Sequence, residues 1–317
     1  MTRGPLFQSS YTHQFSGHET FPLRYGWLKK AYDAVAESGP DAEIKSVFGD
    51  DAIARFGVGK NMVASIRHWA NAAGILEEPG SKTVIATELG HRLFGAGGLD
   101  PYMENPATLW LIHWQLAARP TKTTWFWAFN HFPGVTFERE HLAKGLDRLA
   151  KDRAWSRVAG TTIRSDVACF IRTYVAQQPS GRAGNDDALE SPLSELGLIR
   201  GLGRRDGFRF VRGAKSSLGD GVFAYALLDF WSRYSSAATL SLEAIAHEPG
   251  GPGRVFLLDE NDVADRLSAL DELTNGSLHW SETAGLKQVV RDGDFSAEAG
   301  LVLAELDYVD YAWENAA

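Results

Sequence analysis

The spacing of apolar residues in segment 50–94 predicts a helix, a tight turn, a second helix and a hairpin. A short helical run at 50–55 leads through a glycine-bounded turn at 56–59 into a longer run at 60–73. Apolar residues of the longer run recur at intervals of three and four, on one helical face: Met62, Val63, Ile66, Trp69 and Ala73. After Gly74, two apolar pairs flank a Pro79-Gly80 turn and suit the strands of a hairpin. The segment is therefore predicted to be a winged helix-turn-helix.

The polar face of the second helix indicates what this segment could bind. With the apolar stripe turned inward, the outward positions are Lys60, Asn61, Arg67 and His68, with Lys82 at the tip of the hairpin. Recognition helices contact base edges through their first turns, and basic side chains hold them to phosphate. We therefore predict that these five residues contact DNA. The alternative is a protein-contact module in which Arg67 and His68 are only solvated.

The remaining pattern predicts mostly helices. One helix starts at Pro22, and others follow at 106–118, 138–152 and 165–178, the last capped by Ser165 or Asp166. Helices at 221–233, 241–250 and 258–276 precede two strands within 277–290, and Ser241 is the expected N-cap of the second helix. We predict a mainly α fold with short β hairpins. Its domains would be a winged helix-turn-helix DNA-binding domain (1–120), a helical middle domain ending in a basic strand (121–215) and a winged-helix-like domain with an acidic surface (216–317).

Composition indicates a soluble protein. Hydrophobic residues make up 44% of the 317 residues and charged residues 23%. No apolar run approaches the roughly 20 residues that a membrane helix needs, and the first residues lack the apolar core of a secretory signal. The single cysteine, Cys169, excludes an internal disulfide and a Cys-rich zinc site. We expect a cytoplasmic protein with no membrane partner, in which Cys169 is a buried, inert thiol.

Charge is unevenly distributed along the chain. The net charge of -8 would repel phosphate unless cations gather locally. Segment 200–215 holds six basic residues and one acid, and its alternation predicts a strand with Phe208 and Phe210 facing away from Arg209. We predict DNA contact by Arg200, Arg204, Arg205, Arg209 and Arg212. We expect these arginines to share one groove with the Lys60 helix. The alternative is a solvated face, or pairing with the acidic C-terminal segment.

Two polar groups are candidates for catalysis. One is His18 with Glu19, and the other is Asp186, Asp187 and Glu190. Such groups could hold a divalent cation, Mg²⁺ or Mn²⁺, for phosphodiester cleavage. Each group could instead cap a helix N-terminus. The aromatic residues crowded into 125–132 could stack unpaired bases, but a hydrophobic core is the simpler interpretation.

Acidic residues dominate the predicted helix at 258–276, which carries a single arginine. A surface of this kind would be repelled by a phosphate backbone. We therefore expect the last domain to contact a protein partner.

Seven blocks of sequence resemble a bacterial family of unknown-function domains found beside DNA phosphorothioation genes. In order they are FSGHETFPLRYGWLKK, FGVGKNMVASIRHWANAAGILEE, DPYMENPATLWLIHW, IRTYV, DDALESPLSELGLI, GRVFLLDE and TAGLKQV. The resemblance implies a role in replacing a non-bridging phosphate oxygen of DNA with sulfur, in which nicking one strand opens the backbone. It also implies work alongside a cysteine desulfurase, an ATP pyrophosphatase-like enzyme and an ATPase in a modification and defence system. It assigns no catalytic residues.

Recognised catalytic motifs add little to this picture. The Gly57-Val58-Gly59-Lys60 run is too short for a phosphate-binding loop and lacks a preceding strand, so ATP hydrolysis is disfavoured. Our leading hypothesis is a DNA-binding nickase, an endonuclease that uses Mg²⁺ or Mn²⁺. The alternative is a non-catalytic DNA-binding adaptor that recruits the modification enzymes.

Overall fold

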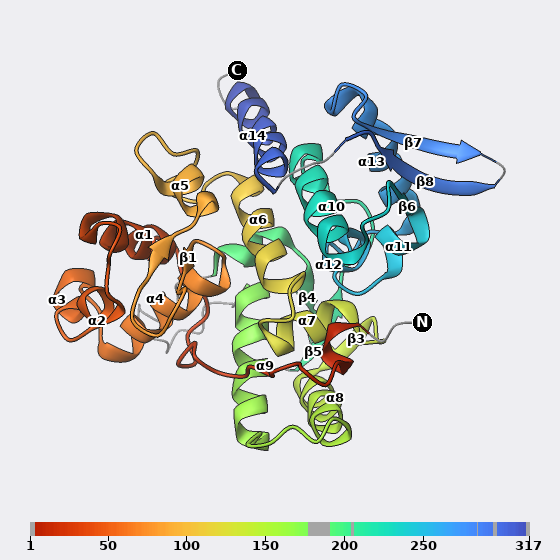
Figure 1. The fold of residues 1–317 in the computed structure, drawn as a ribbon. Helices are drawn as coiled ribbons and strands as arrows, with labels where there is room; N and C mark the ends of the chain where they lie inside the picture. The colour runs from red at the N-terminus through yellow and green to blue at the C-terminus, as the bar shows by residue number, and fades with distance from the viewer. Residues whose placement is uncertain (1–3, 177–190, 204–205, 284, 294–296, 315–317) are drawn as a thin grey trace.

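Helices form most of the molecule, and three small antiparallel sheets lie among them (Figure 1). The computed structural model describes residues 4–176, 191–203, 206–283, 285–293 and 297–314. None of the helices within these ranges combines the length and the apolar character needed to span a membrane. The mainly helical fold class with short hairpins is thus confirmed.

The N-terminal residues form a helical unit around α4 (Figure 1). Its elements are η1 (Pro5–Phe7), α1 (Trp27–Ser38), α2 (Ile44–Phe48), α3 (Ala52–Phe56), α4 (Lys60–Ala72), β1 (Leu76–Glu77), β2 (Ile85–Ala86) and α5 (Glu88–Phe94). α4 packs on α1, α2, α3 and β1, and β1 pairs antiparallel with β2. The predicted helix pair and hairpin are both present. Val63, Ile66 and Trp69 are buried, as their spacing predicted.

The first long helix begins later than predicted. α1 starts at Trp27, after Gly26 in the left-handed conformation with φ 75°, and not at Pro22. Glu19 and Thr20 therefore do not cap this helix, and that interpretation is wrong. The physical reason is that the chain before Gly26 is held by hydrogen bonds to α4 and to a later helix, as described below.

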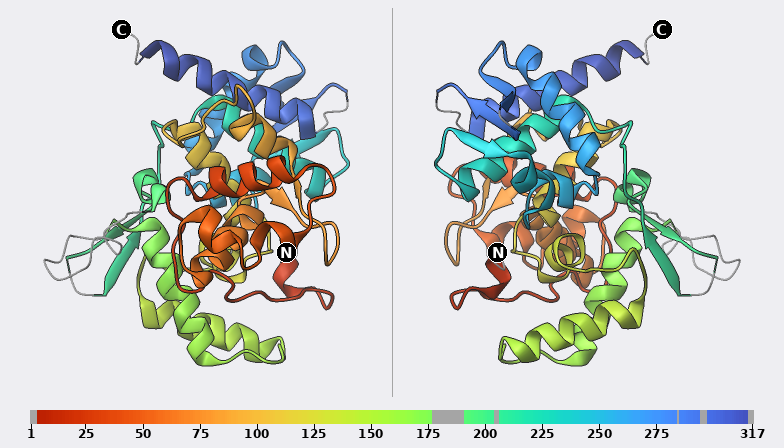
Figure 2. Two further views of the ribbon diagram at one scale, coloured as in Figure 1. Left: turned by 90° about the vertical axis from the view of Figure 1, so that its left-hand side faces the viewer. Right: turned by 90° about the vertical axis from the view of Figure 1, so that its right-hand side faces the viewer.

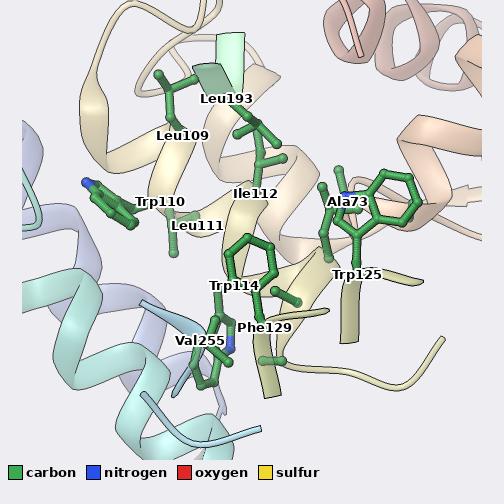
Figure 3. Close-up of a cluster of buried hydrophobic side chains, with 14 of the residues drawn as sticks. Ala73, Leu109, Trp110, Leu111, Ile112, Trp114, Trp125, Phe129, Leu193 and Val255 are labelled. Atoms are coloured by element: carbon green, nitrogen blue, oxygen red, sulfur yellow. The ribbon is translucent and has the colours of Figure 1, made fainter. Parts of the chain in front are cut away.

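A central core surrounds α6 (Pro106–Ala117). Every residue of α6 after Pro106 is buried, which is the property of a helix that is covered on all sides. α6 packs on α7 (Thr123–Asn130), α10 (Asp220–Tyr234) and α14 (Ala297–Glu314). Large aromatic side chains meet here, as Figure 3 shows for Trp110, Trp114, Trp125 and Phe129. The aromatic residues of α7 thus form core rather than a base-stacking surface.

A helical hairpin and a second sheet follow the core. The helices are α8 (Arg139–Asp152) and α9 (Gly160–Tyr174), and the sheet has the order β3-β5-β4, made of β3 (Thr136–Glu138), β4 (Ile199–Gly201) and β5 (Gly207–Phe210). η2 (Pro192–Leu196) precedes β4. In β5, Phe208 and Phe210 are buried and Arg209 is exposed, so the predicted alternation is confirmed. Figure 2 shows β4 and β5 projecting from the body of the molecule.

The last helix of that hairpin is displaced from its predicted start. α9 begins at Gly160, so Asp166 lies in its second turn and does not cap it. Asp166 is buried at 2% exposure, where a carboxylate needs hydrogen-bond partners. The polar pattern around Ser165 and Asp166 therefore marks a tertiary contact and not a helix start.

The C-terminal third packs around α10. It contains β6 (Thr239–Ser241), α11 (Leu242–His247), α12 (Pro252–Val255), α13 (Glu260–Leu273), β7 (Leu278–Thr283) and β8 (Leu286–Arg291), with a sheet of order β6-β8-β7. The Ser241 hydroxyl accepts a hydrogen bond from the Ala244 amide and caps α11, as predicted. α14 was not predicted from the sequence. It packs along α10, and the Asp307 carboxylate accepts hydrogen bonds from the amides of Gly221 and Val222 at the start of α10.

Candidate functional site

The segment from Phe15 to Phe21 lies between α4 and α9. Ser65 and Trp69 of α4 donate hydrogen bonds to the carbonyl oxygens of His18 and Phe21, at 2.9 and 3.0 Å. From α9, the Cys169 thiol donates to the Phe21 carbonyl at 3.3 Å. Ser16, Gly17, Glu19 and Thr20 all have positive φ values. This is a sparsely populated conformation that persists only where surrounding contacts enforce it. We call residues 15–21 the clamped loop.

His18 of the clamped loop is paired with Asp166 of α9. The Thr20 amide donates to His18 Nδ1 at 3.0 Å, so the ring proton is on Nε2. Nε2 then donates to Asp166 Oδ1 at 2.8 Å, and Oδ1 also accepts the Ser16 amide at 2.8 Å. Asp166 Oδ2 is buried and has no hydrogen-bond partner among the described residues. Both residues are only 2% exposed, so this pair fixes the loop from beneath.

His68 of α4 faces the same loop. Its ring lies edge-on to His18 at 5.8 Å, and a Cβ on Gly17 would come within 2.4 Å of His68 Nδ1. Burial holds the pKa of His68 well below its usual value, and the nearby charge of Lys122 lowers it further. His68 is therefore neutral at pH 7. Glycine at position 17 is needed both for this contact and for its φ of 99°.

A pocket of about 550 Å³ opens above this cluster. Residues from the clamped loop, α4, the start of the hairpin and the turn before α7 line it: Gln14, Gly17, Glu19, Ala64, Arg67, His68, Asn71, Ala72, Glu78, Thr121 and Lys122. The structure thus brings two separate sequence candidates together, since Glu19 and His68 lie in one pocket. The two residues of the predicted catalytic pair lie in different surroundings, because His18 is buried against Asp166 and Glu19 is exposed.

Arg67 is already engaged with an acid in this pocket. Its Nε and Nη2 donate to the two carboxylate oxygens of Glu78 at 2.7 and 2.6 Å, and Asn71 donates to Glu78 at 2.8 Å. These hydrogen bonds raise the pKa of Arg67 and lower that of Glu78. Arg67 therefore ties α4 to the hairpin, and phosphate contact by Arg67 would have to compete with Glu78.

Lys122 is the buried cation of the pocket. It is 8% exposed, and its ammonium donates to Gln14 Oε1 at 3.1 Å. Burial lowers its pKa from 10.5 to about 8, partly offset by the charge of Asp166. Lys122 was not identified from the sequence, and neither was Asp166 as a partner of His18. The partners are far apart in the chain and follow no recognisable motif, so nothing in the local pattern could have joined them.

The predicted DNA-contacting residues fall into two regions. Lys60, Asn61 and Lys82 are exposed on the N-terminal unit. Arg200 and Arg209 are exposed and lie directly opposite each other on β4 and β5. Arg212 follows β5, where burial and the charge of Arg254 lower its pKa.

These two regions belong to different parts of the fold. α4 packs within the N-terminal unit, and β5 belongs to the sheet that projects in Figure 2. Arg204 and Arg205 lie outside the described residues. We therefore treat the two basic regions as separate candidate surfaces and not as the walls of one groove.

Within the described part of the chain, no group of three or more His, Cys, Asp or Glu side chains is placed to hold a metal ion. The acidic candidates Asp186, Asp187 and Glu190 lie outside the described residues. Cys169 is fully buried, as predicted, and burial raises the pKa of its thiol, which disfavours the reactive thiolate.

Comparison with known proteins identifies relatives over nearly the whole chain. A family model described as a protein of unknown function, DUF4007, matches residues 15–308. A crystal structure of magnesium ion-bound SspB is 31% identical, with 96% of this chain and 89% of that chain covered and a TM-score of 0.80. Another SspB crystal structure is 30% identical, with 98% and 90% covered and a TM-score of 0.81. No curated protein matches the chain.

Proposed function

The chain belongs to the DUF4007 family, and on that premise we propose that it is a DNA-binding protein of a bacterial DNA phosphorothioation system that nicks one strand. The observation that carries the proposal is the likeness to SspB, at 30–31% identity over nearly the full length of both chains. Its partners would be the cysteine desulfurase, ATP pyrophosphatase-like enzyme and ATPase of the same system.

The arginine pair on the projecting sheet supports DNA contact. Arg200 and Arg209 are cross-strand neighbours, and like charges in this position repel each other unless an anion lies between them. Neither has an ion-pair partner within the described residues. A phosphate of the DNA backbone supplies the missing negative charge. Lys60, Asn61 and Lys82 of the N-terminal unit, which we interpret as a winged helix, would supply a second set of contacts.

We include a divalent metal in the proposal because one of the similar SspB structures is bound to magnesium. The described residues offer no ready-made set of ligands for this ion. Glu19 is the exposed acid of the pocket, and a single carboxylate is a weak site unless substrate phosphates complete it. We therefore assign no step to the metal.

Relaxation of supercoiled plasmid tests the nicking activity. The purified protein is incubated with plasmid and Mg²⁺ or Mn²⁺, alone and with its system partners, and open-circle product is measured. Accumulation of open circles that stops when the metal is chelated is the expected result. If no open circles form even with the partners present, the nickase function is refuted.

A non-catalytic adaptor is the second candidate, and the C-terminal surface favours it. α14 leaves Val302, Leu306 and Val309 exposed at intervals of four and three residues, and α13 exposes several acids. An apolar stripe beside negative charge is suited to a protein partner rather than to DNA. An adaptor would bind DNA with salt-dependent affinity and never produce open circles.

A further inference from the structure

Lys122 carries a positive charge that has no ion-pair partner among the described residues. Its side chain is nine-tenths buried, in a position where charges are normally paired. Of the three donors of the ammonium, one is directed to the amide oxygen of Gln14. In the described part of the chain no carboxylate oxygen lies within 4.0 Å of Nζ. A buried cation of this kind calls for an anion.

None of the charged and titratable neighbours of Lys122 contacts its ammonium. Asp166 is an anion that attracts the ammonium only from beyond ion-pair distance, and its Oδ1 accepts hydrogen bonds from His18 and the Ser16 amide instead. His68 is neutral for the reasons given above. Glu78 is neutralised by Arg67, and Glu19 lies at the exposed mouth of the pocket. The base of the pocket therefore offers a cation that has no direct ion-pair partner among the described residues.

We propose that this pocket binds a phosphate oxyanion, with the Lys122 ammonium as its charged ligand. The volume of about 550 Å³ is large enough for a phosphate together with the attached nucleoside. The clamped loop and α4 hold the walls in place by hydrogen bonds, so the site exists before the ligand arrives. The inference rests on the proposed function for the source of the phosphate, which is the DNA backbone. Free phosphate has the same chemistry, and the experiment separates the two.

The inference is tested by measuring how tightly three forms of the full chain bind phosphate and a short oligonucleotide. These are the wild type, Lys122→Met and the control Lys144→Met, which removes the same charge from an exposed position on α8. Inorganic phosphate is titrated by calorimetry, and a short single-stranded oligonucleotide by fluorescence anisotropy. We expect Lys122→Met to weaken binding at least about tenfold, as for loss of one charged hydrogen bond, and Lys144→Met to leave it unchanged.

Each outcome either identifies the ligand of the pocket or refutes the proposed phosphate site. Weaker binding of the oligonucleotide alone identifies a backbone phosphate, whereas weaker binding of inorganic phosphate alone identifies a free anion. If Lys122→Met binds both as tightly as Lys144→Met, the inference is wrong. That result leaves the proposed function standing wherever the wild type still nicks plasmid. Conversely, if the wild type binds phosphate through Lys122 but forms no open circles, the phosphate site is supported and the nickase function is refuted.

Discussion

Replacing Lys122 with Met should make the ligand-free protein more stable at neutral pH. Burial lowers the pKa of Lys122 from 10.5 to about 8, and each pKa unit corresponds to about 1.4 kcal/mol between the charged and neutral forms. Keeping the ammonium charged in the folded state thus costs about 3 kcal/mol. Met has a similar length and no charge, so Lys122→Met should raise the free energy of unfolding by up to about 3 kcal/mol.

The pH dependence of this difference gives the prediction a definite sign. Below pH 8 the lysine is charged in both states, and the full cost of its burial is present. Between pH 8 and 10.5 the unfolded chain binds more protons than the folded one, so the wild type gains stability as pH rises. The advantage of the Met variant should therefore be largest at pH 7 and shrink towards pH 10.

Urea denaturation of both proteins at pH 7 and at pH 10 measures this difference. Phosphate buffer adds a second readout, because an anion that binds only the folded wild type should raise its stability and leave the variant unchanged. Equal stabilities at pH 7, or a difference that stays the same at pH 10, would refute the reasoning that Lys122 is a buried charge without an ion-pair partner.

Two further substitutions test the clamped loop and the arginine pair. Gly17→Ala should destabilise the protein by more than Gly57→Ala, because both glycines have positive φ but only Gly17 would place a Cβ against the His68 ring. The backbone contribution is about 1–2 kcal/mol in each case, and equal losses in urea denaturation would contradict the contact with His68. Arg209→Gln should weaken DNA binding and lower the slope of log affinity against log salt by about 1. Lys287→Gln, a control on β8, should change neither value, and an unchanged slope for Arg209→Gln would exclude a phosphate contact there.

Local periodicity is what made the helix pair, the hairpin and β5 predictable. In α4 the apolar residues follow the helical repeat, and in β5 they alternate, so each pattern reports a face that the fold buries. The aromatic residues of α7 were predictable as core because their burial removes much apolar area from water. α14 offered no such pattern, because apolar residues occur on its exposed side as well as on the side facing α10.

The pocket could not be predicted from local sequence patterns, because the residues that line it are distant from one another in the sequence. His18 and Asp166 are separated by 148 positions, and the polar residue that seemed to start a helix instead completes a buried pair. Glu19 and His68 were each identified as candidates, but for different functions: catalysis for Glu19 and DNA contact for His68. Only the fold brings the clamped loop against α4 and places Lys122 at the base between them.

The clamped loop also explains why this pocket is a better candidate for function than two larger cavities, of about 720 and 680 Å³, elsewhere in the molecule. Ser16, Glu19 and Thr20 each take a left-handed conformation that costs roughly 1–2 kcal/mol in a residue other than glycine. Hydrogen bonds from α4 and α9 to this loop offset that cost and fix its shape. A surface loop without a function could adopt a relaxed backbone conformation, and it would not require hydrogen bonds to offset strain. A strained loop fixed beside a buried cation that has no ion-pair partner among the described residues is the arrangement expected of a preformed binding site.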